Sequence, residues 1–394
     1  ARLMRDFTVA MRYSSVDKPE DYSRGQVLEL MESYPTEAGD PAARPTNIIV
    51  VMNESFADLT IFEGLEVSED PTPFLHSMKE NTVRGWMYSP VTGGGTASVE
   101  FEYLTGFSTI FQPPHTVAYQ LYAEEGMPSL AALAGSVGYD STAFHPYKSS
   151  GWNRPIVYED MRFDHQLYEE DVTAPYLIRR YVSDQSDYET LYSITDRAEG
   201  DPAFIFNVTM QNHGGYSEDE PAVDVTVMPV DQELQTPQML EYLSLIRESD
   251  AAFKELTVYF SEAEEDTVIL MFGDHQPSMD EGVSEFMDQK LEERDGELDS
   301  QRRYYASFIL WANFDIQEMS DVVTSPGFLR PLLLEAAGVP LNAYESFLFE
   351  TAAAYPAMNA FGCFDASGQW NSRMEDEEGV LEEYQYLVYQ NVFD

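Results

Sequence analysis

Short apolar runs recur along the chain, separated by polar segments and by longer stretches with helical periodicity. The first clear run, at residues 47–52, is continuous and β-branched, which indicates a strand buried on both faces. Similar runs follow at residues 141–144, 203–210, 267–272 and 306–311. Amphipathic or apolar stretches typical of helices lie between them, at residues 97–104, 129–137, 238–263 and 328–337. This alternation predicts an α/β fold with a mostly parallel central sheet flanked by helices.

The two ends of the chain differ from the region between them. Residues 1–44 are polar, with one amphipathic stretch at 26–34 followed by a Pro/Ala/Gly-rich segment, so we expect a lead-in and linker. Residues 341–394 include a turn-rich piece around 362–370, which favours a small C-terminal α+β subdomain with antiparallel strands. The main domain is therefore expected to span residues 45–340.

Composition narrows the class of protein. Apolar residues make up 43% of the chain and aromatic residues 13%, as in a folded protein. The 70 acidic residues outnumber the 22 basic ones, giving a net charge of −48. Such a surface repels nucleic acid, and we interpret it as the solvated coat of an extracellular or salt-adapted protein. Cys363 is the single cysteine, which excludes an internal disulfide.

Polar residues with ligand chemistry directly follow four of the predicted strands. They are Glu54, His145, His213 and the pair Asp274 and His275. Each has an ordinary structural explanation when taken alone, such as a helix cap or a strand-end loop. Ligand sites in open α/β sheets lie beyond the carboxyl ends of the strands, so together these residues predict one convergent site. Carboxylate and imidazole groups there suit a divalent metal.

A glycine-rich segment supplies the candidate nucleophile. Gly93 to Gly95 precede Thr96, which is expected in the first turn of a helix, where free N–H groups favour a phosphate. A threonine hydroxyl is a weak nucleophile near neutral pH, and coordination to a dication activates it. The segment lacks the lysine of a Walker loop. Without metal ligands elsewhere, Thr96 would be read as a simple helix cap.

Two further segments offer groups for a substrate. His145, Trp152 and Arg154 lie within ten residues, and an arginine suits bidentate recognition of phosphate. The alternative for Arg154 is a surface side chain stacked on Trp152. His213 lies in a loop with Gly214 and is a candidate hydrogen-bond donor to phosphoryl oxygens or a general acid/base. The other histidines are interpreted as structural: His76, His115 and His165.

Five motifs in this order carry a family resemblance: Asn53-Glu54-Ser55, Gly93 to Thr96 with Glu100-Phe101, His145 with Trp152 to Arg154, Asn212 to Gly215, and Gly273-Asp274-His275. Over roughly residues 45–340 the chain resembles the lipoteichoic acid synthases of the sulfatase-like, alkaline phosphatase superfamily.

The resemblance implies a sulfatase-like catalytic domain with one divalent cation, Mn²⁺ or alternatively Mg²⁺. The cation would be held by Glu54, Thr96, Asp274 and His275. Thr96 would form a phosphoglycerol–threonine intermediate, and glycerol phosphate would be held by His145, Trp152, Arg154 and His213. The implied donor is a phosphatidylglycerol-type headgroup, and the implied acceptor is a polyglycerol phosphate or a glycan.

The resemblance also implies a location and leaves other activities open. Family members carry N-terminal transmembrane helices, and no apolar run of about 18 residues occurs here, so we expect an ectodomain at the extracellular face of a bacterial cell membrane, without its membrane region. A single Asp-His pair argues for one metal, and the Thr96 segment cannot form a sulfatase formylglycine. Phosphoethanolamine transfer or phosphodiester hydrolysis remain alternatives, as does a non-enzymatic acidic surface protein that binds cations weakly.

Overall fold

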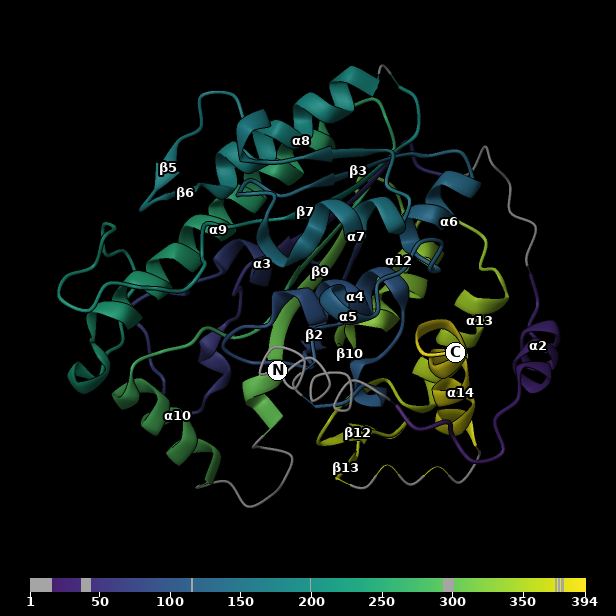
Figure 1. The fold of residues 1–394 in the computed structure, drawn as a ribbon. Coiled ribbons are helices and arrows are strands. Elements are labelled where there is room, and N and C mark those ends of the chain that lie inside the picture. The colour runs from purple at the N-terminus through teal and green to yellow at the C-terminus, as the bar shows by residue number, and fades with distance from the viewer. Residues whose placement is uncertain are drawn as a thin grey trace, which may run out of the picture.

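The apolar runs predicted as strands lie side by side in one eight-stranded sheet with the order β10-β2-β9-β8-β1-β7-β3-β4 (Figure 1). The computed structural model describes residues 16–36, 44–114, 116–198, 200–292, 301–372, 374, 376 and 379–394. The strands of this sheet are β1 (Asn47–Asn53), β2 (Thr82–Tyr88), β3 (Asp140–Phe144), β4 (His165–Leu167), β7 (Ala203–Val208), β8 (Thr267–Gly273), β9 (Tyr305–Ala312) and β10 (Met319–Thr324). Neighbours pair in parallel except at β9, which is antiparallel to both β8 and β2.

The sheet separates two hydrophobic cores. Along β1, Ile48, Val50 and Met52 point into one core, whereas Ile49 and Val51 point into the other. The first core is covered by α2 (Arg24–Ser33), α4 (Thr96–Thr105), α5 (Ala118–Leu121), α6 (Leu130–Ser136), α7 (Arg154–Asp160), α12 (Leu329–Ala336), α13 (Ala343–Ala354) and α14 (Val380–Val392). The second is covered by α3 (Pro73–Ser77), α8 (Asp184–Ala198), α9 (Pro237–Ser261) and α10 (Glu281–Glu292). Burial on both sides explains the continuous apolar character of the central strands.

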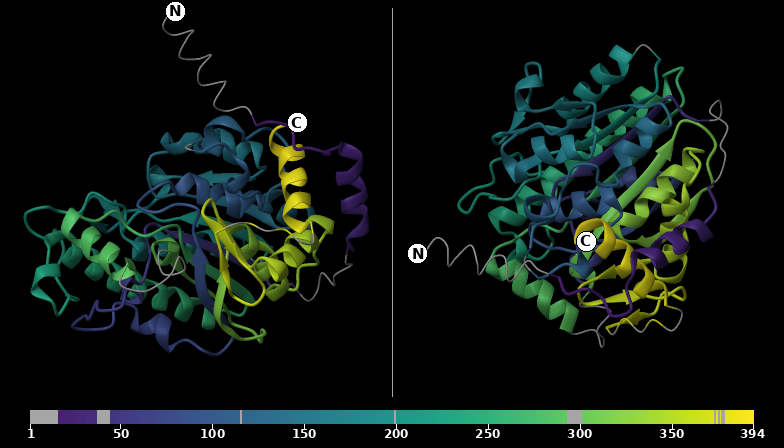
Figure 2. Two further views of the ribbon diagram at one scale, coloured as in Figure 1. Left: turned by 90° about the horizontal axis from the view of Figure 1, so that it is seen from below. Right: turned by 45° about the vertical axis from the view of Figure 1, so that its right-hand side comes forward.

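The two ends of the described chain pack together. Helix α2 lies beside α14 (Figure 2), and the side chains of Tyr22 and Arg24 both donate hydrogen bonds to the carboxylate of Asp394. An antiparallel sheet of β11 (Ala357–Asn359), β12 (Gly362–Phe364) and β13 (Trp370–Asn371) follows α13, as the turn-rich sequence indicated. Met358 and Cys363 of this sheet belong to the first core, and the boundaries at residues 44 and 340 stay predictions.

The remaining elements are short. A two-stranded hairpin is formed by β5 (Leu177–Ile178) and β6 (Tyr181–Val182). Single 3₁₀ turns are η2 (Leu59–Ile61), η3 (Thr109–Phe111), η4 (Gly151–Asn153), η5 (Glu169–Asp171), η6 (Gln232–Leu234), η7 (Gln301–Tyr304) and η8 (Pro326–Phe328). Within the described parts of the chain, no helix has both the length and the apolar character needed to cross a membrane.

Candidate active site

Strand register brings the first two predicted ligands together. Strands β1 and β8 are neighbours, and Asn53 at the end of β1 pairs with Gly273 at the end of β8, so Glu54 and Asp274 leave the sheet side by side. The backbone N–H of Ser55 donates to Oδ1 of Asp274 over 2.7 Å. A Cβ atom on Gly273 would lie 1.7 Å from the carbonyl oxygen of Phe56, so only glycine allows this close approach.

Glu54, Asp274 and His275 fit a divalent cation. All three are buried, and one ligand atom from each lies within 4.8 Å of the other two. Nδ1 of His275 donates to the carbonyl oxygen of Gln276 over 2.9 Å, which leaves the lone pair of Nε2 free as a ligand. Nε2 of His275 and Oδ2 of Asp274 lie 3.2 Å apart, and both are buried without a hydrogen bond to any other described group. Burial, reinforced by Glu54, raises the pKa of Asp274 to about 6, so the ionised cluster needs additional positive charge.

Thr96 is the first residue of α4 and borders this cluster. Gly93, Gly94 and Gly95 precede it with φ angles of +68°, +147° and +100°, a path that side chains with a Cβ rarely adopt. The N–H of Gly93 donates to the carbonyl oxygen of Gln276 over 2.9 Å, which ties the loop to the segment after β8. Oγ1 of Thr96 donates to Oε2 of Glu54 over 3.3 Å. The hydroxyl therefore lies where a metal-activated nucleophile would be needed.

A single cavity of about 250 Å³ gathers the predicted substrate-binding residues next to Thr96. It is lined by Glu54, Ser55, Gly93, Gly94, Gly95, Thr96, His145, Tyr147, Gly151, Trp152, Arg154, Met210, His213, Gly214, His275 and Ser278. Asp274 does not line the cavity because it is fully buried. The structure thus brings every predicted site residue to the same edge of the sheet, while their roles stay predictions.

Arg154 is buried, with 3% of its surface exposed, so it is not the surface side chain of the alternative interpretation. Burial disfavours its charge, but the neighbouring carboxylate of Glu100 outweighs that penalty and raises the pKa of Arg154. Nε lies 3.2 Å from both carboxylate oxygens of Glu100, and Nη2 donates to the same group. Nη1 lies toward Gly151, where a Cβ atom would be 3.2 Å away. Nη1 is thus the part of the guanidinium left for a ligand.

Glu100 is a residue that sequence reasoning missed as a functional partner. Besides Arg154, its Oε2 accepts hydrogen bonds from the hydroxyls of Tyr158, at 2.8 Å, and Tyr119, at 3.2 Å. Glu100 lies one helical turn after Thr96 on α4, so the same helix carries the candidate nucleophile and the anchor of the arginine. The signal available in the sequence was that Glu100 follows Thr96 by one helical turn.

His145 and Trp152 form one wall of the cavity. Nδ1 of His145 donates to the carbonyl oxygen of Val208 over 2.8 Å, so Nε2 is left to accept a hydrogen bond. Burial, together with the charge of Arg154, holds the pKa of His145 well below its usual value, so the ring is neutral at pH 7. Trp152 and Asn153 have left-handed backbones, with φ of 54° and 63°, a strained conformation that occurs most often at functional sites.

His213 is exposed at the rim of the cavity. Its Nδ1 lies 3.2 Å from the hydroxyl of Tyr181 on β6. Desolvation is the main cause that lowers the pKa of His213, so it is mostly neutral at pH 7 and can take up or release a proton. Arg179 fixes the loop by donating to the carbonyl oxygen of His213 over 2.7 Å, and it pairs with Glu241 at 3.1 Å. Neither Arg179 nor Tyr181 was singled out from the sequence.

The histidines interpreted as structural lie outside this cavity where they are described. His76 pairs with Asp58 at 3.3 Å and with Asp70 at 2.8 Å. His165 pairs with Asp140 at 3.1 Å. His115 lies outside the described residues.

Comparisons with known proteins agree with this architecture. The chain is 30% identical, over 98% of its length, to a putative cyclic β-1,2-glucan modification protein of Rhizobium meliloti, and it spans 61% of that relative. The phosphoglycerol transferase GacH of Streptococcus pyogenes, solved with sn-glycerol-1-phosphate, has a TM-score of 0.76 at 18% identity over 96% of both chains. The lipoteichoic acid synthase LtaP of Listeria monocytogenes has a TM-score of 0.65 at 15% identity, covering 93% of this chain and 96% of that one.

The two solved structures show a common fold, and the expectation of a sulfatase-like, mostly parallel α/β domain is confirmed. The chain spans about three-fifths of the length of the Rhizobium relative. The sulfatase family model matches residues 46–339, which include Glu54, Thr96, Asp274 and His275. The chain therefore belongs to the sulfatase family.

Proposed function

We propose that the chain is the catalytic part of a metal-dependent phosphoglycerol transferase at the extracellular face of a bacterial cell membrane. A phosphatidylglycerol-type lipid would be the donor. The observation that carries the proposal is the position of Oγ1 of Thr96, 3.3 Å from Glu54, beside two buried ligand atoms without hydrogen bonds.

The donor set suits one cation, with Glu54, Asp274 and His275 as ligands and Thr96 as a fourth. Two carboxylates and one imidazole form a mixed oxygen and nitrogen set, which favours Mn²⁺ over Mg²⁺. When bound, the cation would supply a Lewis acid that lowers the pKa of the Thr96 hydroxyl.

The reaction has two displacements at phosphorus. In the first, Oγ1 of Thr96 bonds to phosphorus and passes its proton toward Glu54, while the bond from phosphorus to the diacylglycerol oxygen breaks and that oxygen takes a proton from His213. In the second, an acceptor hydroxyl bonds to phosphorus and gives its proton to His213, while the bond to Thr96 breaks and Thr96 recovers its proton. The lowered pKa of His213 leaves the ring mostly neutral, which suits the second step, where it accepts a proton; for the first step it must take up a proton beforehand.

The cavity favours a glycerol headgroup over ethanolamine. Ethanolamine carries a positive charge that a second carboxylate would have to match, and among the described residues lining the cavity Glu54 is the sole carboxylate. Arg154 offers Nη1 to the phosphate, and neutral His145 can accept a hydrogen bond from a glycerol hydroxyl at Nε2. Phosphoethanolamine transfer and simple hydrolysis are the alternative activities.

The acceptor class follows from the Rhizobium relative, which is named for the modification of a cyclic glucan. We propose a glycan acceptor for this chain too, and a polyglycerol phosphate is the alternative. In both cases a hydroxyl group attacks the phosphorylated Thr96, so the chemistry in the cavity is the same.

The test compares wild type with Thr96→Ala and Thr96→Ser, each given phosphatidylglycerol or phosphatidylethanolamine with Mn²⁺. We expect the wild type to release diacylglycerol from phosphatidylglycerol and to gain the mass of glycerol phosphate on Thr96. Thr96→Ala should lose at least about a thousandfold in rate, because covalent catalysis depends on its nucleophile, whereas Thr96→Ser should keep partial activity. Thr96→Ala retaining more than about a tenth of the wild-type rate would exclude Thr96 as the nucleophile. Preference for phosphatidylethanolamine would establish the alternative transferase.

A further inference from the structure

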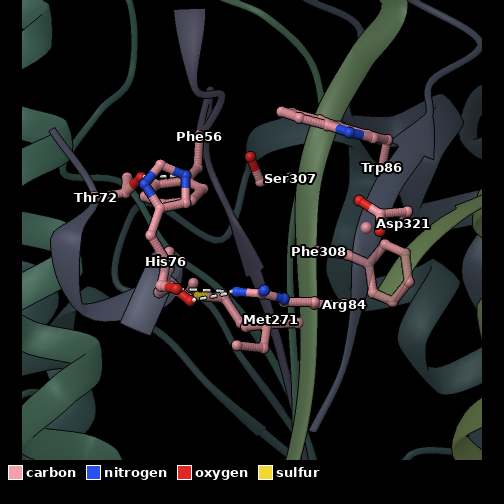
Figure 3. A pocket seen from close by; sticks show the side chains of 12 residues that line it. Phe56, Thr72, His76, Arg84, Trp86, Met271, Ser307, Phe308 and Asp321 are labelled. Atoms are coloured by element: carbon pink, nitrogen blue, oxygen red, sulfur yellow. Dashed lines mark hydrogen bonds between the residues drawn. The ribbon is translucent and has the colours of Figure 1, made fainter. Parts of the chain in front are cut away.

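A second cavity, of about 290 Å³, lies against the face of the sheet that α3 covers and takes no part in the chemistry described above. Strands β2, β9 and β10 line it together with α3 and the segment after β1 (Figure 3). Its lining includes the polar or aromatic side chains of Arg84, Trp86, Ser307 and Asp321. Figure 3 shows Trp86 and Asp321 on one side of this cavity, across from His76 and Thr72.

Arg84 presents an unused hydrogen-bonding edge to this cavity. Its Nη1 donates to the carbonyl oxygens of Leu75, at 3.4 Å, and His76, at 3.1 Å, which holds the side chain in place. Nε and Nη2 have no partner among the described residues, and no described carboxylate forms a salt bridge with Arg84. The remaining edge of the guanidinium can therefore donate hydrogen bonds to a ligand in the cavity.

Trp86 supplies a flat apolar surface. It lies two residues after Arg84 on β2, so both side chains leave the same face of the strand. Its ring stacks on Tyr305 with centroids 6.0 Å apart and planes 20° apart, which fixes the indole while it stays partly exposed. A rigid, partly exposed indole beside hydrogen-bonding groups suits a ligand with an apolar face and a polar rim.

Asp321 is aimed into the cavity by an irregular backbone. The register between β10 and β2 shifts between Met319 and Val322, as at a β-bulge, and Asp321 has a φ of 59°. Gly85 permits the bulge, because a Cβ atom there would lie 1.8 Å from the carbonyl oxygen of Val322. Bulges of this kind re-aim side chains. Ser320 donates to Oδ2 of Asp321 over 3.0 Å, which leaves Oδ1 for a ligand.

We propose that this cavity binds a neutral sugar ring, as a non-catalytic subsite for the glycan acceptor. Donors on Arg84, an acceptor on Asp321 and the hydroxyl of Ser307 together match sugar hydroxyls, and the apolar face of the ring would stack on Trp86. A simple anion fits less well, because the carboxylate of Asp321 would repel it. As a subsite for the acceptor, the proposal rests on the proposed function.

The position of the cavity suits an acceptor chain that extends to the active site. Phe56 lines it and lies two residues after Glu54. Ser89, three residues after Trp86, donates through Oγ to the carbonyl oxygen of Asp274 over 2.7 Å. Both cavities border the segment after β1, but this one opens on the sheet face covered by α3, whereas Thr96 begins α4 on the other face. An oligosaccharide held in the subsite would therefore pass around the segment after β1 to bring its far end to Thr96.

The test is calorimetric titration of the full chain with a linear β-1,2-linked glucose hexasaccharide, which needs no turnover. Trp86→Ala and Arg84→Gln should each weaken binding at least about tenfold, the loss expected for one well-formed contact, and Trp86→Phe should restore part of it. Phe361→Ala is the matched control, because Phe361 is an exposed aromatic residue that does not line the cavity. Thermal unfolding of each variant shows that it is folded.

Saturation with sn-glycerol-1-phosphate, which is expected to fill the catalytic cavity, should leave hexasaccharide affinity unchanged. The subsite is disproved if wild type shows no binding up to about 10 mM, or if Trp86→Ala and Arg84→Gln bind within about twofold of wild type. It is also disproved if glycerol phosphate displaces the sugar. Sugar binding that depends on Trp86, in a chain that transfers no phosphoglycerol, would support the subsite and overturn only the proposed function.

Discussion

At the scale of single residues, the candidate metal site contains two buried ligand atoms that lack a hydrogen bond. Oδ2 of Asp274 and Nε2 of His275 are buried without a hydrogen bond, an arrangement that costs about 1–3 kcal/mol for each group unless a partner arrives. Glu54 completes the set and also accepts the hydrogen bond of Thr96. A cation would therefore satisfy both orphaned atoms and the excess negative charge together.

Removing one of these ligands should remove the metal. We expect wild-type protein to retain about one Mn²⁺ per chain after dialysis, and Glu54→Ala to retain almost none, because a site that loses one of its two carboxylate ligands binds far more weakly. Elemental analysis measures this without any substrate. Glu248→Ala is the control, since Glu248 is an exposed carboxylate on α9. Equal metal loss in both variants, or diffuse uptake that follows total acidity, would instead indicate weak binding by the acidic coat.

The sequence predicted the candidate ligands but not the residues that hold them in position. Glu54, His145 and Asp274 were recognisable because each directly follows a strand, and His213 because it lies in the loop after β7; parallel strands deliver such residues to one edge. The partnership of Glu100 with Arg154 spans 54 residues and joins two helices that a one-dimensional pattern cannot place in contact. Supporting contacts of this kind depend on how elements pack, which strand-end positions do not reveal.

At the scale of elements, α4 carries two buried carboxylates in contrasting surroundings. Glu100 faces Arg154 and two tyrosine hydroxyls. Glu102 accepts hydrogen bonds from Thr109 and Ser108 but has no cation among the described residues. Burial raises the pKa of Glu102 to about 7, although those hydrogen bonds oppose the rise. The two carboxylates should therefore respond in opposite ways to the same substitution.

Glu100→Gln should destabilise the fold by about 3 kcal/mol, because it leaves the charge of Arg154 buried and unpaired. Glu102→Gln should instead stabilise the fold at high pH. The folded pKa near 7 exceeds the ordinary value of 4.5, so wild type loses stability as the pH rises through that interval, and the amide avoids this loss. At pH 8 we expect a gain of up to about 3 kcal/mol over wild type, fading by pH 4. Chemical denaturation at both pH values measures it, and equal effects of the two variants would contradict the assignment.

The strands show what hydrophobic patterning can and cannot predict. The five predicted runs became strands because burial on both faces demands continuous apolar sequence. Strand β2 was missed because Arg84 and Gly85 interrupt its apolar run. Strand β10 was missed because it is short and polar and has a bulge at Asp321. The antiparallel direction of β9 could not be predicted from the sequence either, because strand direction depends on the path of the connection after β8.

At the scale of the whole molecule, the proposed substrate and the protein carry the same sign of charge. The net charge of −48 creates a repulsive field toward a phosphodiester. Arg154 is the sole arginine or lysine among the described residues that line the catalytic cavity, and Glu100 already neutralises most of its charge. Attraction at short range would therefore have to come from the cation, from Nη1 of Arg154 and from the N-terminus of α4.

Salt should consequently help the reaction or leave it unchanged. The screening length falls from about 10 Å at 0.1 M salt to under about 5 Å at 0.5 M, which weakens the distant repulsion more than contacts made inside a buried cavity. We expect kcat/KM for a soluble glycerophosphodiester to stay level or rise between about 0.05 and 0.5 M KCl. Metal content measured at each salt concentration is the control, because loss of Mn²⁺ would mimic an effect on the substrate. A steep fall with the metal retained would mean that long-range attraction guides the substrate, and that a positive field around the cavity outweighs the acidic surface.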